Sequence, residues 1–179
     1  MKKIKLIDKE FKLYIPQKKI RSVVERMAGD MNRNLDGKSP LFVCVLNGAF
    51  MFAADLFKQI DIPGAEITFV KMASYHGIHS SGTIRQLIGL NESIDGRTVI
   101  VIEDIVDSGS TIEEILAQLA ILKPKEVKIA TLLSKPDAMI KEVKLDYVGL
   151  EIPNDFIVGY GLDYDGQGRN LIDIYSIVQ

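Results

Sequence analysis

The sequence predicts a single α/β domain in which a doubly wound, mostly parallel β-sheet carries helices on both faces. Two observations predict this fold. Continuously apolar runs of strand length alternate along the chain with stretches whose apolar residues recur at helical spacing. Strands that are apolar throughout are typical of parallel sheets covered on both faces. The length of 179 residues fits one domain of ordinary size with a substantial core.

The first elements follow from apolar spacing. Residues 16–34 place their apolar side chains on one helical face. That face comprises Ile20, Val23, Val24, Met27, Ala28 and Met31. Residues 41–46 are continuously apolar and too few for a typical helix, so they predict a strand buried on both faces. Asn47-Gly48 is a turn signal, and residues 50–60 resume helical spacing.

The middle of the chain continues the alternation with one interruption. A second strand is predicted at residues 67–73, a third at residues 98–102 and a fourth at residues 127–133, with a helix at residues 112–122. Residues 74–84 are polar and glycine-rich and break the pattern. A long irregular insertion in a compact domain is usually a functional lid or a disordered segment.

The last part of the chain, from residue 136 onward, lacks helical spacing. Weaker strands are predicted at residues 147–150, 156–160 and 172–177. We therefore expect this tail to form an irregular cap near the carboxyl ends of the strands, where open α/β sheets bind their ligands.

Composition excludes several classes of function. A formal net charge of −2 argues against a protein whose main task is to coat nucleic acid, which needs a basic face. The apolar runs are far too short to span a membrane, and the basic N-terminal residues have no apolar core of signal-peptide length. We expect a cytoplasmic protein. Its single cysteine, Cys44, falls in an apolar run and is expected to be a buried thiol.

The run VIVIEDIVDSGST at residues 99–111 is the most informative stretch for function. Its four β-branched residues predict a central strand, which places Glu103 and Asp104 at the carboxyl end of the sheet. Two neighbouring carboxylates there can hold a cation or accept hydrogen bonds from a sugar diol. The alternative is that they form a solvated strand end.

A helix start follows directly. Ser110-x-x-Glu113 and Thr111-x-x-Glu114 both have the pattern of a capping box, so the helix is predicted to begin at one of the two hydroxyls. The backbone N–H groups of residues 107–111 then converge at a helix N-terminus, where Gly109 permits close approach of a phosphate. No lysine is present, which favours a monophosphate over a triphosphate. Many strand-loop-helix segments bind nothing, however, and this remains the alternative.

Taken whole, residues 99–111 resemble the phosphoribosyl-pyrophosphate (PRPP) signature of the type I phosphoribosyltransferases. Four other stretches resemble the hypoxanthine-guanine phosphoribosyltransferases in particular, in that family's order, between about residues 41 and 171. They are residues 46–52, Ser74-Tyr75, residues 132–136 and residues 151–164. The last stretch discriminates, because adenine, orotate and uracil members of the superfamily do not share it.

The resemblance implies a fold, a reaction and partners. The fold is the type I phosphoribosyltransferase fold, a single domain over residues 1–179 with its core at about residues 36–135. A small hood comes from the N-terminal segment and residues 136–179. The reaction is magnesium-dependent purine salvage, in which PRPP and hypoxanthine or guanine give IMP or GMP and pyrophosphate. The family is typically dimeric or tetrameric, and neither a membrane nor a nucleic acid is implied as a partner.

The resemblance also implies roles for residues around the sugar and its 5′-phosphate. Glu103 and Asp104 would hold the ribose hydroxyls, directly or through magnesium. Asp107 would in addition face N7 of the purine and handle its proton, which makes it the expected catalytic residue. The 5′-phosphate would be held by Asp107, Ser108, Gly109, Ser110 and Thr111.

Further roles concern the base and the pyrophosphate. Lys135 would donate to the 6-oxo group of the purine, Phe156 would stack on the ring and the Ile157 backbone would meet the base edge. Asp163, beside the base pocket, would bind a magnesium ion that bridges to pyrophosphate. The pyrophosphate contacts would come from Asn47, Gly48, Ser74, Tyr75 and Arg169.

An oxocarbenium-like sugar is open to attack by water, so an enzyme of this kind needs a lid, and residues 74–84 have a suitable composition. The chain departs from the family pattern at Asn47, where a basic residue is common, at Gly168, where an aromatic is common, and at Ile172, where proline is frequent. Two alternatives remain open: a xanthine-preferring enzyme, and a non-catalytic regulatory homologue that senses PRPP or nucleotides.

Overall fold

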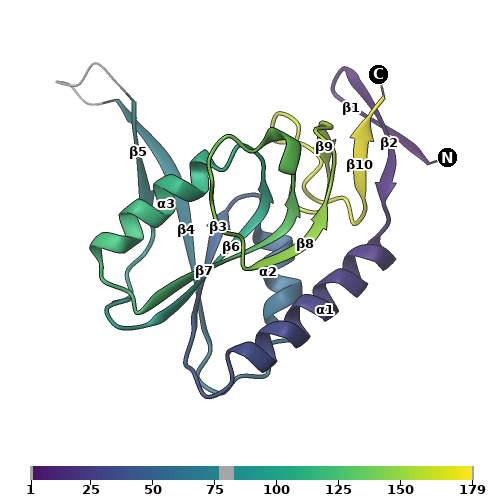
Figure 1. Ribbon diagram of the computed structural model, residues 1–179. Coiled ribbons are helices and arrows are strands. Elements are labelled where there is room, and N and C mark those ends of the chain that lie inside the picture. Colours follow the sequence, from purple (N-terminus) through teal and green to yellow (C-terminus); the bar gives the residue numbers. More distant parts are fainter. Residues whose placement is uncertain (1, 77–82, 179) are drawn as a thin grey trace.

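A mostly parallel sheet forms the centre of the molecule. The computed structural model describes residues 2–76 and 83–178. Within them, six strands pair in the order β5-β4-β3-β6-β7-β8 (Figure 1). Their bounds are β3 Leu41–Leu46, β4 Glu66–His76, β5 Thr83–Ile88, β6 Thr98–Val106, β7 Glu126–Ser134 and β8 Tyr147–Glu151. All neighbours are parallel except β5, which runs antiparallel to β4 at one edge. The predicted α/β class is confirmed.

Helices cover both faces of this sheet. α1, Gln17–Asn34, and α2, Phe50–Phe57, pack on one face, and α3, Ser110–Ile121, packs on the other. Residues of β6 alternate between the two cores: Ile100 and Ile102 join the α1 and α2 side, whereas Val99 and Val101 join the α3 side. A central strand with apolar side chains on both faces is what the continuous apolar run predicts. Cys44 is fully buried, as expected.

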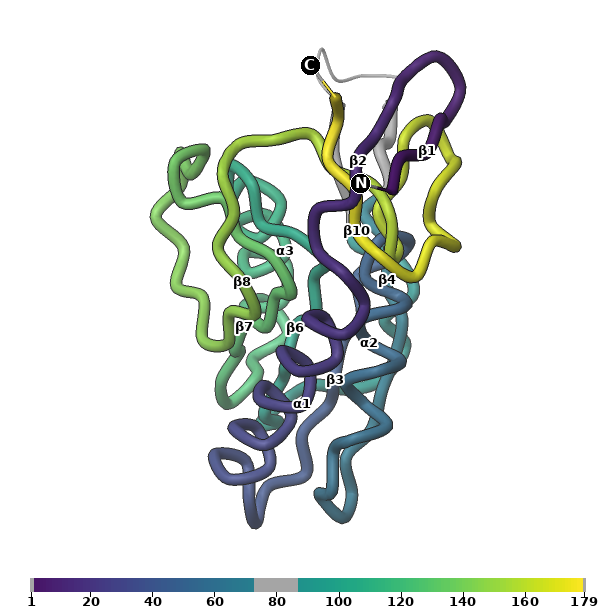
Figure 2. Tube along the Cα trace, turned by 90° about the vertical axis from the view of Figure 1, so that its right-hand side faces the viewer, coloured from purple at the N-terminus to yellow at the C-terminus, as the bar shows by residue number. Residues whose placement is uncertain are grey.

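A second sheet is built from the two ends of the chain. Its strands are β1 Lys3–Leu6, β2 Lys9–Ile15, β9 Ile157–Val158 and β10 Ile174–Ile177, in the antiparallel order β1-β2-β10-β9. Figures 1 and 2 show this hood beyond the carboxyl ends of the central strands, with β2 leading directly into α1. Asp173 ties the hood to that helix, because its Oδ1 accepts a hydrogen bond from the Gln17 N–H at 2.9 Å.

The tail from residue 136 differs from the irregular hood that the sequence predicts, because β8 joins the central sheet beside β7 and only β9 and β10 belong to the hood sheet. The bounds of β6 and β4 also differ from the prediction. β6 continues to Val106, so Glu103 and Asp104 lie inside the strand rather than after it; the β7 residues Thr131 and Leu133 supply its parallel partners there. β4 and β5 form an antiparallel ribbon in which Ser74 pairs with Arg85. The ends of the predicted irregular stretch at 74–84 are therefore regular, and residues 77–82 lie outside the described residues.

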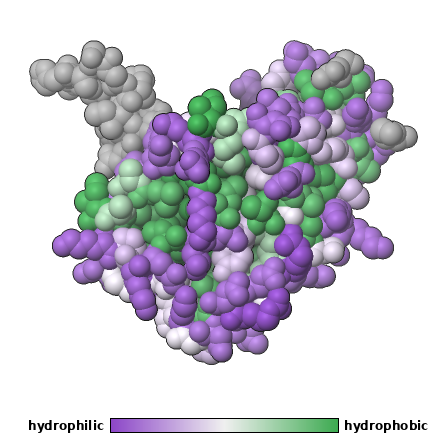
Figure 3. Space-filling view, in the orientation of Figure 1, coloured by the Kyte–Doolittle hydropathy of each residue, from purple (hydrophilic) through white to green (hydrophobic). Residues whose placement is uncertain are grey.

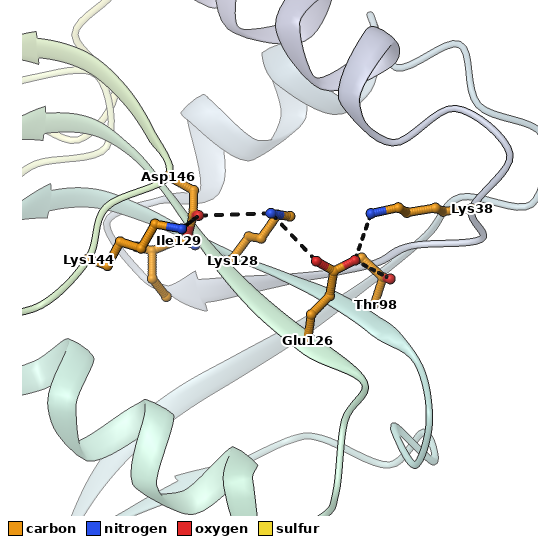
Figure 4. Close-up of polar contacts among 7 residues, drawn as sticks. All are labelled: Lys38, Thr98, Glu126, Lys128, Ile129, Lys144 and Asp146. Carbon is orange, nitrogen blue, oxygen red and sulfur yellow. Dashed lines mark hydrogen bonds and ion pairs between the residues drawn. The ribbon is translucent and has the colours of Figure 1, made fainter.

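A polar network closes the opposite, amino-terminal edge of the sheet (Figure 4). Glu126 Oε1 accepts hydrogen bonds from Lys38 Nζ at 2.7 Å and from the Thr98 hydroxyl at 2.9 Å. Lys128 lies between Glu126 and Asp146, with Nζ to carboxylate distances of 3.5 and 3.9 Å. The hydrogen bond from Lys38 is the main reason that the Glu126 pKa is lowered to about 2.

An apolar groove lies on the surface between α3 and residues 87–90. Apolar residues gather over α3 in Figure 3, and a groove of about 250 Å³ is lined by Leu87, Leu90, Gln118, Leu119, Ile121 and Leu122. None of the helices in the described part of the chain is long and apolar enough to cross a membrane.

Candidate active site

The loop between β6 and α3 forms a small anion-sized cavity. Gly109 has φ +82° and is the N-cap of α3, which begins at Ser110. The predicted helix start at Ser110 is confirmed, but the predicted capping boxes are wrong. The cap position is held by a glycine with no side chain, because the turn needs a left-handed backbone there. The Ser108 hydroxyl accepts from the Ser110 N–H instead, at 3.3 Å. Residues Glu103, Ile105, Val106, Asp107, Ser108, Gly109, Thr111 and Ile112 line a cavity of about 80 Å³.

The segment after β7 supports this loop from behind. The N–H groups of Ile140 and Lys141 both donate to the Ser108 carbonyl at 3.0 Å. The Lys141 side chain also pairs with Glu113 of α3 at 2.9 Å. A Cβ at Gly109 would lie 3.0 Å from the Lys141 carbonyl oxygen, so glycine is required by both the backbone conformation and the space available. These contacts hold residues 107–111 in place, which is the preorganisation that anion binding needs. The resemblance assigns this segment to the 5′-phosphate, and it is called the phosphate loop below.

Lys135 and Asp107 meet next to that loop. Lys135 follows β7 directly and is 7% exposed, and its Nζ lies 3.3 Å from Asp107 Oδ2. The same ammonium donates to Asn154 Oδ1 at 3.5 Å. The Asp107 side chain is 53% exposed, so it faces the open side of the pair. The structure thus brings together the two residues that the resemblance assigned to the purine 6-oxo group and N7, and it adds Asn154.

The acids of β6 have different neighbours. Glu103 is buried and lines the phosphate-loop cavity. The Asp104 carboxylate lies against Gly48 so closely that no Cβ fits there, and it accepts from the Ile105 N–H at 2.9 Å. Burial raises the Asp104 pKa to about 6, although the charge of Arg169 opposes the shift and that of Asp163 adds to it. Adjacent residues of a strand point to opposite faces of the sheet, which explains why Glu103 and Asp104 have different neighbours.

Arg169 and Asp163 form a compact unit beside Gly48. Their ion pair has an Nη2 to Oδ1 distance of 2.7 Å, and Arg169 Nη1 donates to the Gly161 carbonyl at 2.7 Å. Gly161 packs on the Gly48 carbonyl, again with no room for a Cβ. The peptide bond between Leu46 and Asn47 is cis, and Asn47 is exposed. Most of the residues assigned to magnesium and pyrophosphate therefore meet here, with Asp104 among them.

The hood contributes Phe156 and Ile157. Phe156 is 45% exposed, and its ring lies 6.2 Å from that of Phe11 and 5.8 Å from that of Tyr164, centroid to centroid. Ile157 is buried in β9. An aromatic ring that is fixed by two others and keeps a large exposed area can stack on a planar base.

Several roles need residues that local patterns do not reveal. Asn154 was visible only as part of the stretch 151–164, and nothing in its spacing identifies it as a partner of Lys135. The backbone of residues 139–141 carries no sequence signal for its support of the phosphate loop. Ser74 and Tyr75 lie in the β4–β5 ribbon, and their contacts with pyrophosphate stay a prediction.

Comparisons with known proteins identify the family of the chain. The model of the phosphoribosyl transferase domain family matches residues 14–165. A hypoxanthine-guanine phosphoribosyltransferase of Streptococcus thermophilus is 40% identical over 168 residues, which are 93% of this chain and 93% of that protein. The bifunctional protein TilS/HprT of Listeria monocytogenes is 40% identical over 89% of this chain, which spans only 25% of that longer protein.

The fold agrees as well. The crystal structure of a hypoxanthine phosphoribosyltransferase from Staphylococcus aureus superposes with a TM-score of 0.85 at 34% identity, over 93% of this chain and 91% of that one. The sequence match to the Streptococcus thermophilus protein and the structural match to the Staphylococcus aureus protein each cover more than nine tenths of both chains. The chain therefore belongs to the hypoxanthine-guanine phosphoribosyltransferases, a family of enzymes built on the phosphoribosyl transferase domain.

Proposed function

We propose that this chain transfers the 5-phosphoribosyl group of PRPP to N9 of hypoxanthine or guanine, giving IMP or GMP and pyrophosphate in cytoplasmic purine salvage. The observation that carries the proposal is the Lys135–Asp107 pair, 3.3 Å apart, beside a preformed phosphate loop. The chain is proposed to act as a homodimer or homotetramer, which sedimentation measurements can determine.

The base side follows from donor and acceptor chemistry. An ammonium group can only donate hydrogen bonds. Buried Lys135 therefore favours binding of a purine with a 6-oxo group, which accepts a hydrogen bond, over binding of one with a 6-amino group. As N9 attacks C1′ and the bond to pyrophosphate breaks, the purine becomes more acidic at N7. Asp107 takes up that proton or holds it, acting as a general base. Phe156 fixes the plane of the ring.

The phosphate side is electrostatic. The N-terminus of α3 and the amides of the loop hold the 5′-phosphate. Arg169 lies where the departing pyrophosphate gathers negative charge, and a fixed cation there stabilises the transition state. The Arg169 guanidinium is oriented by two contacts of 2.7 Å, to Asp163 and to the Gly161 carbonyl, so little reorganisation is needed when charge develops.

Magnesium fits this donor set. Asp104 and Asp163 offer hard carboxylate oxygens, and each such oxygen has a second lone pair beyond its present contact. In residues 2–76 and 83–178, no group of three or more His, Cys, Asp or Glu forms a metal site. Magnesium commonly binds through one or two carboxylates together with substrate phosphates. Asp163 and Asp104, with Glu103 on the ribose side, would hold it, and when bound it would neutralise charge on the pyrophosphate.

The test is direct. The purified protein is incubated with PRPP, magnesium and each of hypoxanthine, guanine, xanthine and adenine, and nucleotide formation is followed by chromatography. We expect IMP and GMP, little product from xanthine and none from adenine. A clear preference for xanthine would replace the proposed substrate, and no nucleotide from any base would overturn the proposal of catalysis.

A further inference from the structure

Tyr160 lies in a strained loop beside the site. Its φ is +51°, between Gly159 at +103° and Gly161 at +100°. Residues with a bulky side chain rarely adopt such a conformation, and they keep it only where their surroundings impose it. Tyr160 is 3% exposed. The loop thus holds a buried tyrosine in a backbone conformation that glycine would adopt more readily.

A hydrogen bond to helix α2 fixes this tyrosine. The Tyr160 hydroxyl donates to Asp55 Oδ2 at 2.7 Å, across 105 positions of sequence. Asp55 Oδ1 accepts from Lys58 Nζ at 2.7 Å. Burial raises the Asp55 pKa, but the hydrogen bonds from Lys58 and Tyr160 outweigh it and leave the pKa below its ordinary value. The carboxylate therefore stays charged at neutral pH and remains a strong acceptor.

The two residues joined by this hydrogen bond lie next to the two parts of the proposed pyrophosphate site, Arg169 and the Gly48 turn. On one side, Tyr160 precedes Gly161, whose carbonyl orients Arg169 and whose N–H donates to the Arg169 carbonyl at 3.0 Å. On the other side, Asp55 belongs to α2, which starts just after the Gly48 turn. Gly161 and Gly48 also touch directly. The loop is thus attached to the α2 segment at two points, one backbone contact and one partly buried hydrogen bond.

We propose that Tyr160 and Asp55 are positioning residues that fix Arg169 relative to the Gly48 turn and thereby set the affinity for the pyrophosphate group of PRPP. The inference rests on the proposed function. Neither side chain touches the substrate; both act through Gly161 and α2.

The surroundings make the idea testable without destroying the fold. The Asp55 side chain is 39% exposed and borders a cavity of about 380 Å³ between α1 and α2, with Gln17 and Arg21 on its wall. Water can therefore reach the site of a truncated Asp55. The chain also offers a matched control: Tyr175 is buried and its hydroxyl donates to Asp173 at 3.3 Å, in the hood.

The experiment compares five proteins: wild type, Tyr160→Phe, Asp55→Ala, the double variant and Tyr175→Phe. For each, calorimetry gives the Kd for PRPP with magnesium, kinetics gives KM for PRPP and for hypoxanthine, and thermal unfolding gives Tm. We expect Tyr160→Phe and Asp55→Ala each to weaken PRPP about tenfold, the change that the loss of one hydrogen bond to a charged group produces. The double variant should lose no more than either single one, and KM for hypoxanthine should stay within about twofold in all.

Other outcomes separate the possibilities. An unchanged PRPP affinity in Tyr160→Phe overturns the inference, as does an equal loss in Tyr175→Phe, which would mark a general effect of stability. If Tyr160→Phe fails to fold, Asp55→Ala carries the same test. Should the wild type bind PRPP but form no nucleotide, catalysis fails while the calorimetric comparison still decides the role of Tyr160. A wild type that does not bind PRPP overturns both proposals.

Discussion

Replacing Lys135 with methionine tests the base-recognition pair most directly. Methionine is similar in length and apolar, so it fills the buried channel of the side chain without the ammonium. The variant loses the contacts of Nζ with Asp107 at 3.3 Å and Asn154 at 3.5 Å. Because Asp107 is 53% exposed, its released carboxylate is hydrated, and the stability cost should be about 1 kcal/mol or less.

The effect on catalysis should be larger and selective. A hydrogen bond from a charged donor to the purine 6-oxo group contributes about 1.5–3 kcal/mol, which corresponds to a loss of about 10- to 150-fold in kcat/KM for hypoxanthine and guanine. The discrimination against adenine should shrink by a similar factor, because a 6-amino purine never received this bond. KM for PRPP should change little.

The assay measures kcat/KM for each base and Tm for each protein. Lys128→Met is the matched control, since Lys128 lies near the start of β7, whose end Lys135 follows, and its Nζ is 3.5 Å from Glu126 and 3.9 Å from Asp146 at the amino-terminal edge of the sheet. An equal loss of kcat/KM for hypoxanthine and for PRPP, or a large fall in Tm, would show that Lys135 stabilises the fold rather than binds the base.

Three other perturbations follow from the structure. Asp107→Asn should retain PRPP binding and lose about 10² to 10⁴ in turnover, the range for a positioned proton-transfer group; stopped-flow or steady-state rates decide, and unchanged turnover would remove Asp107 from the chemistry. Gly109→Ala places a Cβ at a φ of +82° and should cost about 1–2 kcal/mol, with a weaker Kd for PRPP; a normal Tm and Kd would contradict the tight turn. The Glu126 pKa lies at about 2 against an ordinary 4.5, so its pairing with Lys38 stabilises the fold above about pH 4.5 and loses this effect as the pH falls toward 2. Glu126→Gln should thus cost about 1 kcal/mol at pH 7 and nothing at pH 2 in urea unfolding, and a constant difference would refute the assignment.

Local patterns predict the central sheet well because its strands are defined by their own composition. The strand at Leu41–Leu46 and the helix at Gln17–Asn34 agree with the apolar runs almost to the residue. The extension of β6 through Glu103 and Asp104 could not be predicted in this way, because the pairing partners come from β7. The two neighbouring acids end the apolar pattern from which the strand is predicted. The backbone hydrogen bonds between β6 and β7 continue past them, because they do not depend on side-chain polarity.

The hood strands and the contacts of the site are the parts of the structure that the sequence predicts weakly or not at all. The residues of β1 alternate lysine with isoleucine and leucine, a half-buried strand pattern, but a four-residue alternation alone is a weak signal. The sequence offers the hydroxyls of Ser110 and Thr111 as caps for α3, but neither caps the helix, because the left-handed turn at Gly109 occupies the cap position. Tyr160 and Asp55 are 105 positions apart in the sequence. The identity of each residue alone does not predict which distant residue it contacts.

The placement of β10 between β2 and β9 has a consequence for biosynthesis. A ribosome delivers β1 and β2 before the central sheet, but β10, the strand that joins them to β9, follows every strand of that sheet. The hood wall that presents Phe156 can close only after β10 has been translated, by which time all six strands of the central sheet have been synthesised. A nascent chain that has not yet reached Ile174–Ile177 would therefore hold a formed β6–α3 loop without the finished wall that we propose for the base.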